Sequence, residues 1–381
     1  LKYYISDTVS ELDFKQNNKF GRRVKGYKKW NMDKIEFYVL NKLLYSLIVS
    51  CDFYATYHYH SRKTVDMGLV DNIGDIISVY KNYDVYKSIK EYEKSSKADK
   101  PINALRSEMF LEAERNLLKN LSSHIFYLEA PTGSGKTNTS INLALNLVKE
   151  MPEINKVFYI FPFNTLVEQT KKTFKDIFSD RVEYAVINSI TPVVTVEEDK
   201  EEDKGIEIDY EKSYLNRQFL HYPFVITTHI NFFNYLFGCG REANFPLTQL
   251  CNSVVILDEI QGYRNTIWKE IIMFLQKYAK ILNIKIIIMS ATLPRLDKLI
   301  DDPVQKSNFT SLVEDRKKYF EADLFKKRVK LNYELLDNGE IKLDDLRSKL
   351  KEVIEQRKDG TKILIEFIKK DTAREFYSDI K

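Results

Sequence analysis

Short apolar runs alternate with amphipathic segments through the middle of the chain. The runs are rich in β-branched and aromatic residues, and Val254-Val255-Ile256-Leu257 is apolar at every position. Continuous apolar runs are typical of parallel strands that helices cover on both faces. We predict strands over residues Ile125–Leu128, Lys156–Phe161, Tyr184–Ile187, Phe224–Thr227, Ser253–Leu257 and Ile284–Met289. Their alternation with helical segments indicates an α/β fold with a doubly wound parallel sheet, whose ligands bind at the carboxyl ends of the strands.

The first hundred residues have a mostly helical pattern. Ile35 to Ile48 is a long apolar-rich stretch without Gly or Pro, which predicts a buried helix. Tyr83 to Lys100 is dense in Lys and Glu, which predicts a solvated helix followed by a linker. We therefore expect residues 1–100 to form an all-α segment in front of the α/β part.

A second α/β pattern begins near Lys326. Val329–Tyr333 and Lys362–Phe367 are predicted strands, with a charged helix between them and another from Asp371 onward. Two strands cannot form an independent doubly wound domain, so this pattern indicates a truncated second domain. The predicted domains are residues 1–100, 101–310 and 311–381.

Charge and cysteine content indicate the cellular location of the protein more than its function. The 381 residues include 59 Lys and Arg against 55 Asp and Glu, and a net charge of +4 does not by itself indicate a nucleic-acid partner. The acidic run from Glu197 to Lys204 predicts a mobile insertion. The three cysteines lack zinc or redox spacing, and no stretch reads as a membrane span or a signal peptide, so we expect a cytoplasmic protein without a membrane partner. The chain begins at Leu1 instead of Met, which we interpret as a sign of a fragment.

The strongest chemical signal is a phosphate-binding turn, Ala130-Pro131-Thr132-Gly133-Ser134-Gly135-Lys136-Thr137, between the first predicted strand and a helix. A strand that ends in a Gly-rich turn and opens a helix presents a row of backbone N–H groups to an anion. Lys136 can reach the β- and γ-phosphates of a nucleotide, and the Thr137 hydroxyl can ligate Mg²⁺. The strict motif begins with Gly where this one has Ala130, and the alternative is a Gly-rich turn with a chance Lys-Thr. The flanking strand and helix favour the nucleotide site.

An acidic pair, Asp258 and Glu259, ends a buried predicted strand and is followed by Gln261. Nucleotide hydrolysis needs a carboxylate to hold the metal and a group to orient water, and we assign these roles to Asp258 and Glu259 respectively. Adjacent residues of an extended strand point to opposite faces, so the pair must lie where the backbone turns. The alternative is a surface feature, which the preceding strand disfavours.

Small hydroxyl side chains end the next predicted strand. Ser290 and Thr292 are placed to connect the acidic site to an interface that moves. The alternative is an ordinary helix cap before a helix that starts near Pro294.

Two further strand ends carry hydroxyls and amides in front of a helix. One contains Pro162, Asn164 and Thr165, and the other contains Thr227 and Thr228. Helix N-terminal N–H groups with such side chains suit the phosphates of a single strand of nucleic acid, and ordinary helix capping explains them equally well.

The order of these motifs resembles that of the superfamily 2 helicases, from the phosphate-binding turn through the Pro-x-x-x-Leu and Thr-Thr segments to the Asp-Glu tetrad and Ser-Ala-Thr. The tetrad Asp258-Glu259-Ile260-Gln261 resembles that of the CRISPR-associated helicase-nuclease of type I interference systems. Asn103–Met109 is similar to the segment that leads into the helicase core of that family. Leu43–Asp52 is similar to the last helix of its His-Asp (HD) nuclease domain.

The resemblance implies a RecA-like fold for residues 101–310, the end of an HD-type nuclease domain and a linker before it, and the start of a second RecA-like domain after it. ATP and Mg²⁺ are the implied cofactors. Residues Thr132 to Thr137 and Gln261 would bind the nucleotide, Thr137 and Asp258 would hold Mg²⁺, and Lys136, Asp258 and Glu259 would drive hydrolysis. Ser290 and Thr292 would couple hydrolysis to strand movement.

The resemblance also implies partners and a second metal. Single-stranded DNA would bind at residues Pro162, Asn164, Thr165, Thr227 and Thr228, and a CRISPR RNA-guided surveillance complex would recruit the protein. Asp52 would be the final ligand for a divalent transition metal in the nuclease domain, although from the residues alone a salt bridge or a helix cap suits it as well. The upstream histidines of that nuclease and the later arginine motifs of the helicase are not in this sequence.

The motifs and the resemblance leave three candidate functions, which experiments can distinguish. The first is an ATP-dependent single-stranded DNA translocase, of 3′-to-5′ direction by resemblance, that accompanies an HD nuclease in degrading foreign DNA. The second is an RNA helicase or remodeller of the same fold, because backbone contacts do not distinguish the two nucleic acids. The third is a nucleotide- or partner-binding fragment without turnover.

Overall fold

The computed structural model describes residues 33–179, 181–188, 210–262, 267–292, 309–328, 343–356 and 364–380, together with residues 333, 339 and 362. The chain divides into two units, residues 1–325 and 326–381. The two predicted domain boundaries, after residues 100 and 310, remain predictions.

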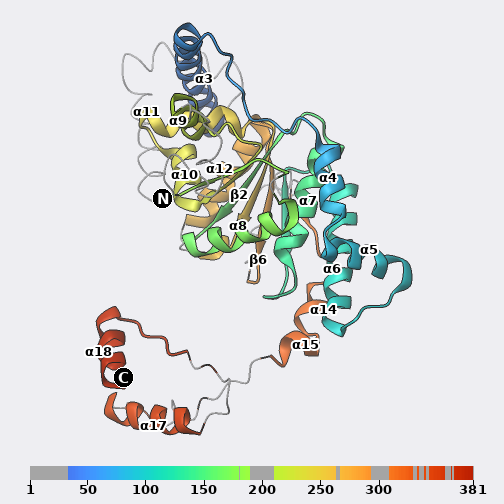
Figure 1. Ribbon diagram of the computed structural model, residues 1–381, viewed down its shortest axis with the longest axis vertical. Helices are drawn as coiled ribbons and strands as arrows, with labels where there is room; N and C mark the ends of the chain where they lie inside the picture. Colours follow the sequence, from blue (N-terminus) through green and yellow to red (C-terminus); the bar gives the residue numbers. More distant parts are fainter. Residues whose placement is uncertain are drawn as a thin grey trace, which may run out of the picture. The chain divides into compact units, whose positions relative to one another are not determined.

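The described part of the first unit is built on a seven-stranded parallel sheet (Figure 1). Its strands are β1 (Ile125–Glu129), β2 (Lys156–Phe161), β3 (Tyr184–Ile187), β4 (Phe224–Thr228), β5 (Ser253–Asp258), β6 (Lys285–Ser290) and β7 (Phe309–Ser311). They lie in the order β3-β4-β2-β5-β6-β1-β7, and every pair is parallel. Each predicted strand of the central part is present, and β7 was not predicted. The α/β class with a parallel sheet is therefore confirmed.

Burial along the strands follows their place in the sheet. Every residue of β2, β5 and β6 is buried, as expected for strands with neighbours on both sides and helices on both faces. The edge strand β3 is only half-buried over most of its length. The continuous apolar runs in the sequence thus mark the centre of the sheet.

Helices cover both faces of this sheet (Figure 1). They are α3 (Lys34–Ser61), α4 (Ile73–Lys81), α5 (Asp84–Ser95), α6 (Pro101–Lys119), α7 (Lys136–Glu150), α8 (Asn164–Phe178), α9 (Tyr210–Phe219), α10 (His229–Phe237), α11 (Arg241–Asn244), α12 (Trp268–Ile281) and α14 (Arg316–Phe320), with 3₁₀ turns η2 (Phe245–Leu250) and η3 (Ile260–Gly262). A short helix, α15 (Asp323–Lys326), lies at the boundary between the units.

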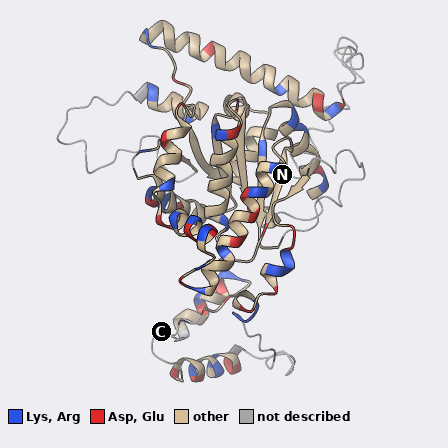
Figure 2. Cartoon of the chain, turned by 90° about the vertical axis from the view of Figure 1, so that its right-hand side faces the viewer, with Lys and Arg blue, Asp and Glu red and all other residues tan. Residues whose placement is uncertain are grey.

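Alternate strand residues face two separate hydrophobic clusters. Tyr159 and Ile256 pack with α6, α7 and α8 on one face, whereas Phe158 and Val255 pack with α10 and α12 on the other. This alternation is the period of two that an extended chain imposes. Figure 2 shows that the charged residues fall mostly on the helices around the sheet. Two layers of helices therefore enclose the sheet, and its carboxyl edge carries the loops.

Helix α3 differs from its prediction. The helix forms, with a capping box in which the Asp33 side chain accepts from the Glu36 backbone N–H. It is not buried all round, because Leu44 and Ile48 are 50% and 69% exposed while Lys42 is buried. The Lys42 Nζ donates to the carbonyl of Gly238 at 2.6 Å, which satisfies a carbonyl just past the end of α10. Polar contacts therefore hold this helix together with the apolar packing of Val39 and Val49, and the predicted buried helix is wrong on its outer face.

In the second unit, the described residues form helices α17 (Leu343–Glu355) and α18 (Lys370–Ile380), both at predicted positions. The predicted strand over Lys362–Phe367 is not formed among the residues of it that the structure describes, 362 and 364–367. A strand forms only where a neighbouring strand supplies hydrogen-bond partners, and the described residues of this segment have no such pairing. The predicted strand from Val329 lies outside the described residues except for Tyr333, and the acidic run 197–204 lies outside them entirely. Among the described residues, no helix has the length and apolarity that a membrane crossing requires.

Candidate active site

The turn between β1 and α7 has the backbone of a phosphate cradle. Gly133 and Gly135 adopt φ of 77° and 90°, a left-handed conformation that residues with a Cβ rarely take. Gly135 is the N-cap of α7, so the first amides of that helix open toward the turn. Ala130, which replaces the first glycine of the strict motif, is fully buried and donates its N–H to the Ser290 carbonyl at 3.2 Å. The cradle therefore forms with Ala at this position.

Lys136 lies folded over the turn. Its Nζ donates to the carbonyl of Ala130 at 3.0 Å and approaches that of Pro131 at 3.4 Å. Burial lowers the pKa of this ammonium, and the negative charges of Glu259 and Asp258 oppose that shift. Lys136 and the acidic pair thus lie within electrostatic reach of one another.

The acidic pair lies at the end of β5, where the backbone turns. Glu259 has a φ of 52°, unusual for a residue with a side chain, and its N–H donates to the Met289 carbonyl on the neighbouring strand at 2.9 Å. Such strained conformations concentrate at functional sites. The turn lets Asp258 and Glu259, adjacent in sequence, line one cavity. This is the geometry that the pair requires to act together.

Hydrogen bonds connect Glu259 to the end of β6. The Ser290 Oγ donates to Glu259 Oε2 at 3.2 Å, and the Gln261 side-chain amide donates to the same oxygen. The backbone N–H of Thr292 donates to Ser290 Oγ at 3.0 Å, while the Thr292 side chain is exposed. Ser290 therefore contacts the Glu259 carboxylate directly, and the backbone of Thr292 contacts Ser290. Gln261 supports the acid in this structure.

One cavity of about 720 Å³ holds these groups together. The glycine turn, Lys136, Thr137, Asp258 and Glu259 line one part of it, and α5 and α6 line another. From α6, Arg106 donates Nε and Nη2 to the Gly133 carbonyl at 3.0 and 2.8 Å. Sequence reasoning assigned no role to Arg106. The resemblance of Asn103–Met109 to a helicase segment pointed to the helix, but the contact depends on tertiary packing.

The residues present fit a magnesium ion. Asp258 Oδ1 is buried and has no hydrogen-bond partner among the described residues. Burial and the adjacent charge of Glu259 raise the pKa of Asp258 to about 7, with Lys136 acting in the opposite direction. A cation bound there would satisfy the oxygen and return the carboxyl to its charged form. Thr137 lines the same cavity, and a carboxylate with a hydroxyl and substrate phosphates is a typical Mg²⁺ ligand set.

The DEAD/DEAH box helicase family model matches residues 108–299, about half of the chain. This range contains the phosphate cradle, the acidic pair and Ser290. The chain belongs to the DEAD/DEAH box helicase family. Its sheet and helices are thus a RecA-like helicase fold, preceded by a helical segment.

Two curated relatives are similar to this helicase beyond the core. A "putative CRISPR-associated nuclease/helicase Cas3" of Methanocaldococcus jannaschii is 26% identical over 267 residues, covering 69% of this chain and 34% of the relative. A "CRISPR-associated nuclease/helicase Cas3" of Haloferax volcanii is 24% identical over 233 residues, covering 55% and 25%. The chain thus spans a third of one relative and a quarter of the other. The similarity to the CRISPR-associated helicase-nucleases, expected from the tetrad, is confirmed.

A solved structure with a similar arrangement is the DUF1998 helicase MrfA. It is 13% identical, the match covers 77% of this chain and 40% of that one, and the TM-score is 0.43. The fold of this helicase is established by its own sheet order and by the family match.

The segments predicted to hold nucleic acid lie at the carboxyl edge of the helicase sheet. Phe161 of β2 and Thr228 of β4 are register partners, so the segments that follow them start side by side. Pro162 is half-buried and Thr165 is exposed at the start of α8. Asn164 Oδ1 is buried, and within the described residues it makes no hydrogen bond. These groups remain predicted contacts.

Thr227 and Thr228 differ in what their hydroxyls do. Thr227 is fully buried, and its hydroxyl donates to the Ile187 carbonyl at 2.5 Å. The Thr228 hydroxyl accepts from the Asn231 N–H at 3.4 Å and caps α10. Thr227 therefore positions this segment from within the sheet. Thr228 is also buried, at 8% exposure, so a direct contact of either threonine with nucleic acid stays a prediction.

Asp52 is exposed on the outer face of α3. Its carboxylate lies 3.7 Å from the guanidinium of Arg241, which matches the salt-bridge alternative. Within the described ranges, no three His, Cys, Asp or Glu side chains gather in a way that could hold a metal ion. Its role as a nuclease ligand stays a prediction.

Proposed function

We propose that this helicase is an ATP-dependent single-stranded DNA translocase that accompanies an HD nuclease in the degradation of CRISPR-targeted DNA. The observation that carries the ATPase part is the convergence of Lys136, Thr137, Asp258 and Glu259 on one cavity beside a glycine cradle. The names of both curated relatives supply the nuclease and the CRISPR context.

The residues of the cavity divide the work of phosphoryl transfer. The cradle amides and Lys136 bind the β- and γ-phosphates, and Lys136 exchanges its bonds to the turn carbonyls for phosphate oxygens. Asp258 and Thr137 would hold Mg²⁺, which would neutralise the charge that develops on the phosphate oxygens. Glu259 orients the attacking water and accepts its proton. Ser290 and Gln261 hold the Glu259 carboxylate in place from two sides.

The coupling to nucleic acid follows from the position of Ser290. Ser290 is the last residue of β6, and its side chain contacts both the Glu259 carboxylate and the backbone of Thr292. A movement of the segment after β6 would therefore change the position of Glu259. In this proposal the strand of DNA crosses the nearby edge formed by Asn164, Thr165 and Thr228.

The remaining parts of the proposal rest on the relatives. They are recruitment by a CRISPR RNA-guided surveillance complex, a cytoplasmic location, and an HD nuclease metal to which Asp52 would contribute. Each of these three is a proposal about the whole protein.

The test compares stimulation of ATP hydrolysis by oligo(dT) and oligo(U) of one length, with the 381-residue chain and Mg²⁺. We expect single-stranded DNA to stimulate hydrolysis more than RNA does. Equal or greater stimulation by RNA would replace the proposal with an RNA helicase. Nucleotide binding without hydrolysis on either strand would replace it with a binding fragment.

A further inference from the structure

Two large apolar side chains stand exposed at the carboxyl edge of the sheet, where the ATP cavity does not reach. Phe163 is 65% exposed and Ile230 is 79% exposed. Phe163 follows β2 as the N-cap of α8, and Ile230 is the second residue of α10 after β4. Neither is among the residues that line the ATP cavity.

The sheet register relates the two positions. Phe161 and Thr228 are register partners in adjacent parallel strands. Phe163 lies two residues after Phe161, and Ile230 lies two residues after Thr228. Strands in a sheet lie about 4.8 Å apart, so the two segments leave the edge next to each other. The helices that follow belong to opposite layers, because α8 packs in one hydrophobic cluster and α10 in the other. Phe163 and Ile230 therefore flank the same stretch of edge from its two sides.

Packing of the fold does not require these side chains. The helices bury other residues against the sheet, such as Val167 of α8 and Phe232 of α10, which are 0% and 1% exposed. A single exposed apolar residue is ordinary on a protein surface. Two of them at matching positions, beside the polar groups proposed to hold a nucleic-acid backbone, call for a ligand with both phosphates and apolar surfaces.

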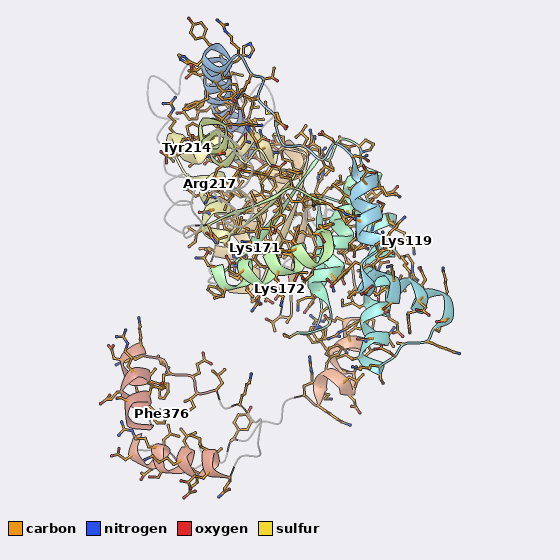
Figure 3. The ribbon with its side chains drawn as sticks, viewed as in Figure 1. Lys119, Lys171, Lys172, Tyr214, Arg217 and Phe376 are labelled. Atoms are coloured by element: carbon orange, nitrogen blue, oxygen red, sulfur yellow. The ribbon has the colours of Figure 1, made fainter. Side chains whose placement is uncertain are left out.

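We infer that Phe163 and Ile230 contact the bases of the single strand whose phosphates lie along this edge. This inference rests on the proposed function and adds to it. Aromatic rings stack on the face of any base, and aliphatic side chains such as Ile insert between neighbouring bases. The contact is therefore independent of sequence, which suits a translocase. Lys171 and Lys172, exposed on the helix that starts beside Phe163, add positive charge for the phosphates (Figure 3).

The experiment separates base contacts from phosphate contacts. The full chain is titrated into a fluorescent oligo(dT) and into an abasic oligonucleotide with the same phosphodiester backbone, and anisotropy is measured. We expect the parent protein to bind oligo(dT) more tightly. Phe163→Ala should weaken oligo(dT) binding about tenfold, the order of magnitude for loss of one stacked base, and leave abasic binding unchanged. Ile230→Ala should act in the same direction with a smaller effect.

A matched control is Ile48→Ala, which removes a 69% exposed aliphatic side chain from α3 and should change neither affinity. Thermal melting establishes that each variant is folded. If Phe163→Ala lowers the affinity for oligo(dT) and for the abasic oligonucleotide equally, or lowers neither, the inference is overturned. If the parent protein binds both strands equally, the base contact fails while the proposed function stands. If it binds neither strand, the proposed function fails first.

Discussion

Replacing Arg106 by Ala removes a clamp on the phosphate cradle. The Arg106 guanidinium donates twice to the Gly133 carbonyl, at 3.0 and 2.8 Å, and once to the Asn103 side chain at 3.1 Å. With this carbonyl held by α6, the left-handed turn at Gly133 keeps its amides available for phosphate. Without the clamp, the turn must be ordered when ATP binds, and that ordering lowers affinity.

The magnitude follows from the two shared bonds. A hydrogen bond from a charged donor contributes roughly 1.5–3 kcal/mol, and the lower end applies because Arg106 is half-buried and both bonds reach one acceptor. A loss of about 1.5 kcal/mol corresponds to about tenfold weaker binding. Arg106→Lys keeps the charge but not the fork, so we expect an intermediate loss.

Titration of a fluorescent ATP analogue with Mg²⁺ measures this effect. Arg115→Ala is the matched control, because Arg115 is exposed on the same helix and does not line the cavity. Unchanged affinity in Arg106→Ala, or an equal loss in Arg115→Ala, would refute the clamp.

Three further perturbations probe other contacts. Ser290→Ala removes a hydrogen bond from Glu259 and should lower kcat about tenfold with little change in ATP affinity, whereas a change confined to affinity would contradict the coupling role. Burial lowers the pKa of His221 to about 4, so the unfolded chain binds more protons than the folded one between about pH 6.5 and 4, and stability falls as pH decreases through that window. Urea melts should show that this residue lowers the free energy of unfolding by about 2 kcal/mol between roughly pH 7.5 and 5. The free energy of unfolding of His221→Gln should depend correspondingly less on pH. Lys42→Met leaves the Gly238 carbonyl without its donor and should destabilise the docking of α3 by about 2 kcal/mol in thermal melts, and an unchanged melt would argue against polar docking.

The strands at the centre of the sheet could be predicted because they are buried on both faces. Such strands need an unbroken apolar run, and β2, β5 and β6 have one or nearly so. Strand β7 could not be predicted, because its three residues, Phe309 to Ser311, carry no periodic signal. It forms because the edge of β1 offers it a parallel ladder.

Helix α3 shows the limit of reading burial from composition. Its apolar residues suggested a buried helix, yet Leu44 and Ile48 face outward while Lys42 and Ser46 are buried. The Ser46 hydroxyl donates to the Asn244 carbonyl at 2.6 Å. The carbonyls that Lys42 and Ser46 contact belong to residues about two hundred positions away, so no local pattern contains them.

Part of the candidate site could be predicted from the sequence, and part of it could not. The glycine turn and the acidic pair could be predicted because each follows a strand, and the carboxyl ends of parallel strands meet at one edge. The contact from Arg106 could not, since it depends on how α6 packs. The different partners of the Thr227 and Thr228 hydroxyls could not be predicted, because the two are adjacent residues of one type on opposite faces of β4.

Hydrolysis of ATP by Lys136→Ala, measured beside the parent chain with Mg²⁺ and single-stranded DNA, tests the central claim most directly. Lys136 shares its cavity with Asp258 and Glu259, and removal of one such charge-stabilising group lowers the rate of phosphoryl transfer by about a hundredfold or more. We predict that Lys136→Ala loses hydrolysis by at least this factor while it remains folded. Hydrolysis at the parent rate would show that the cradle and the acidic pair do not act on a shared magnesium–ATP.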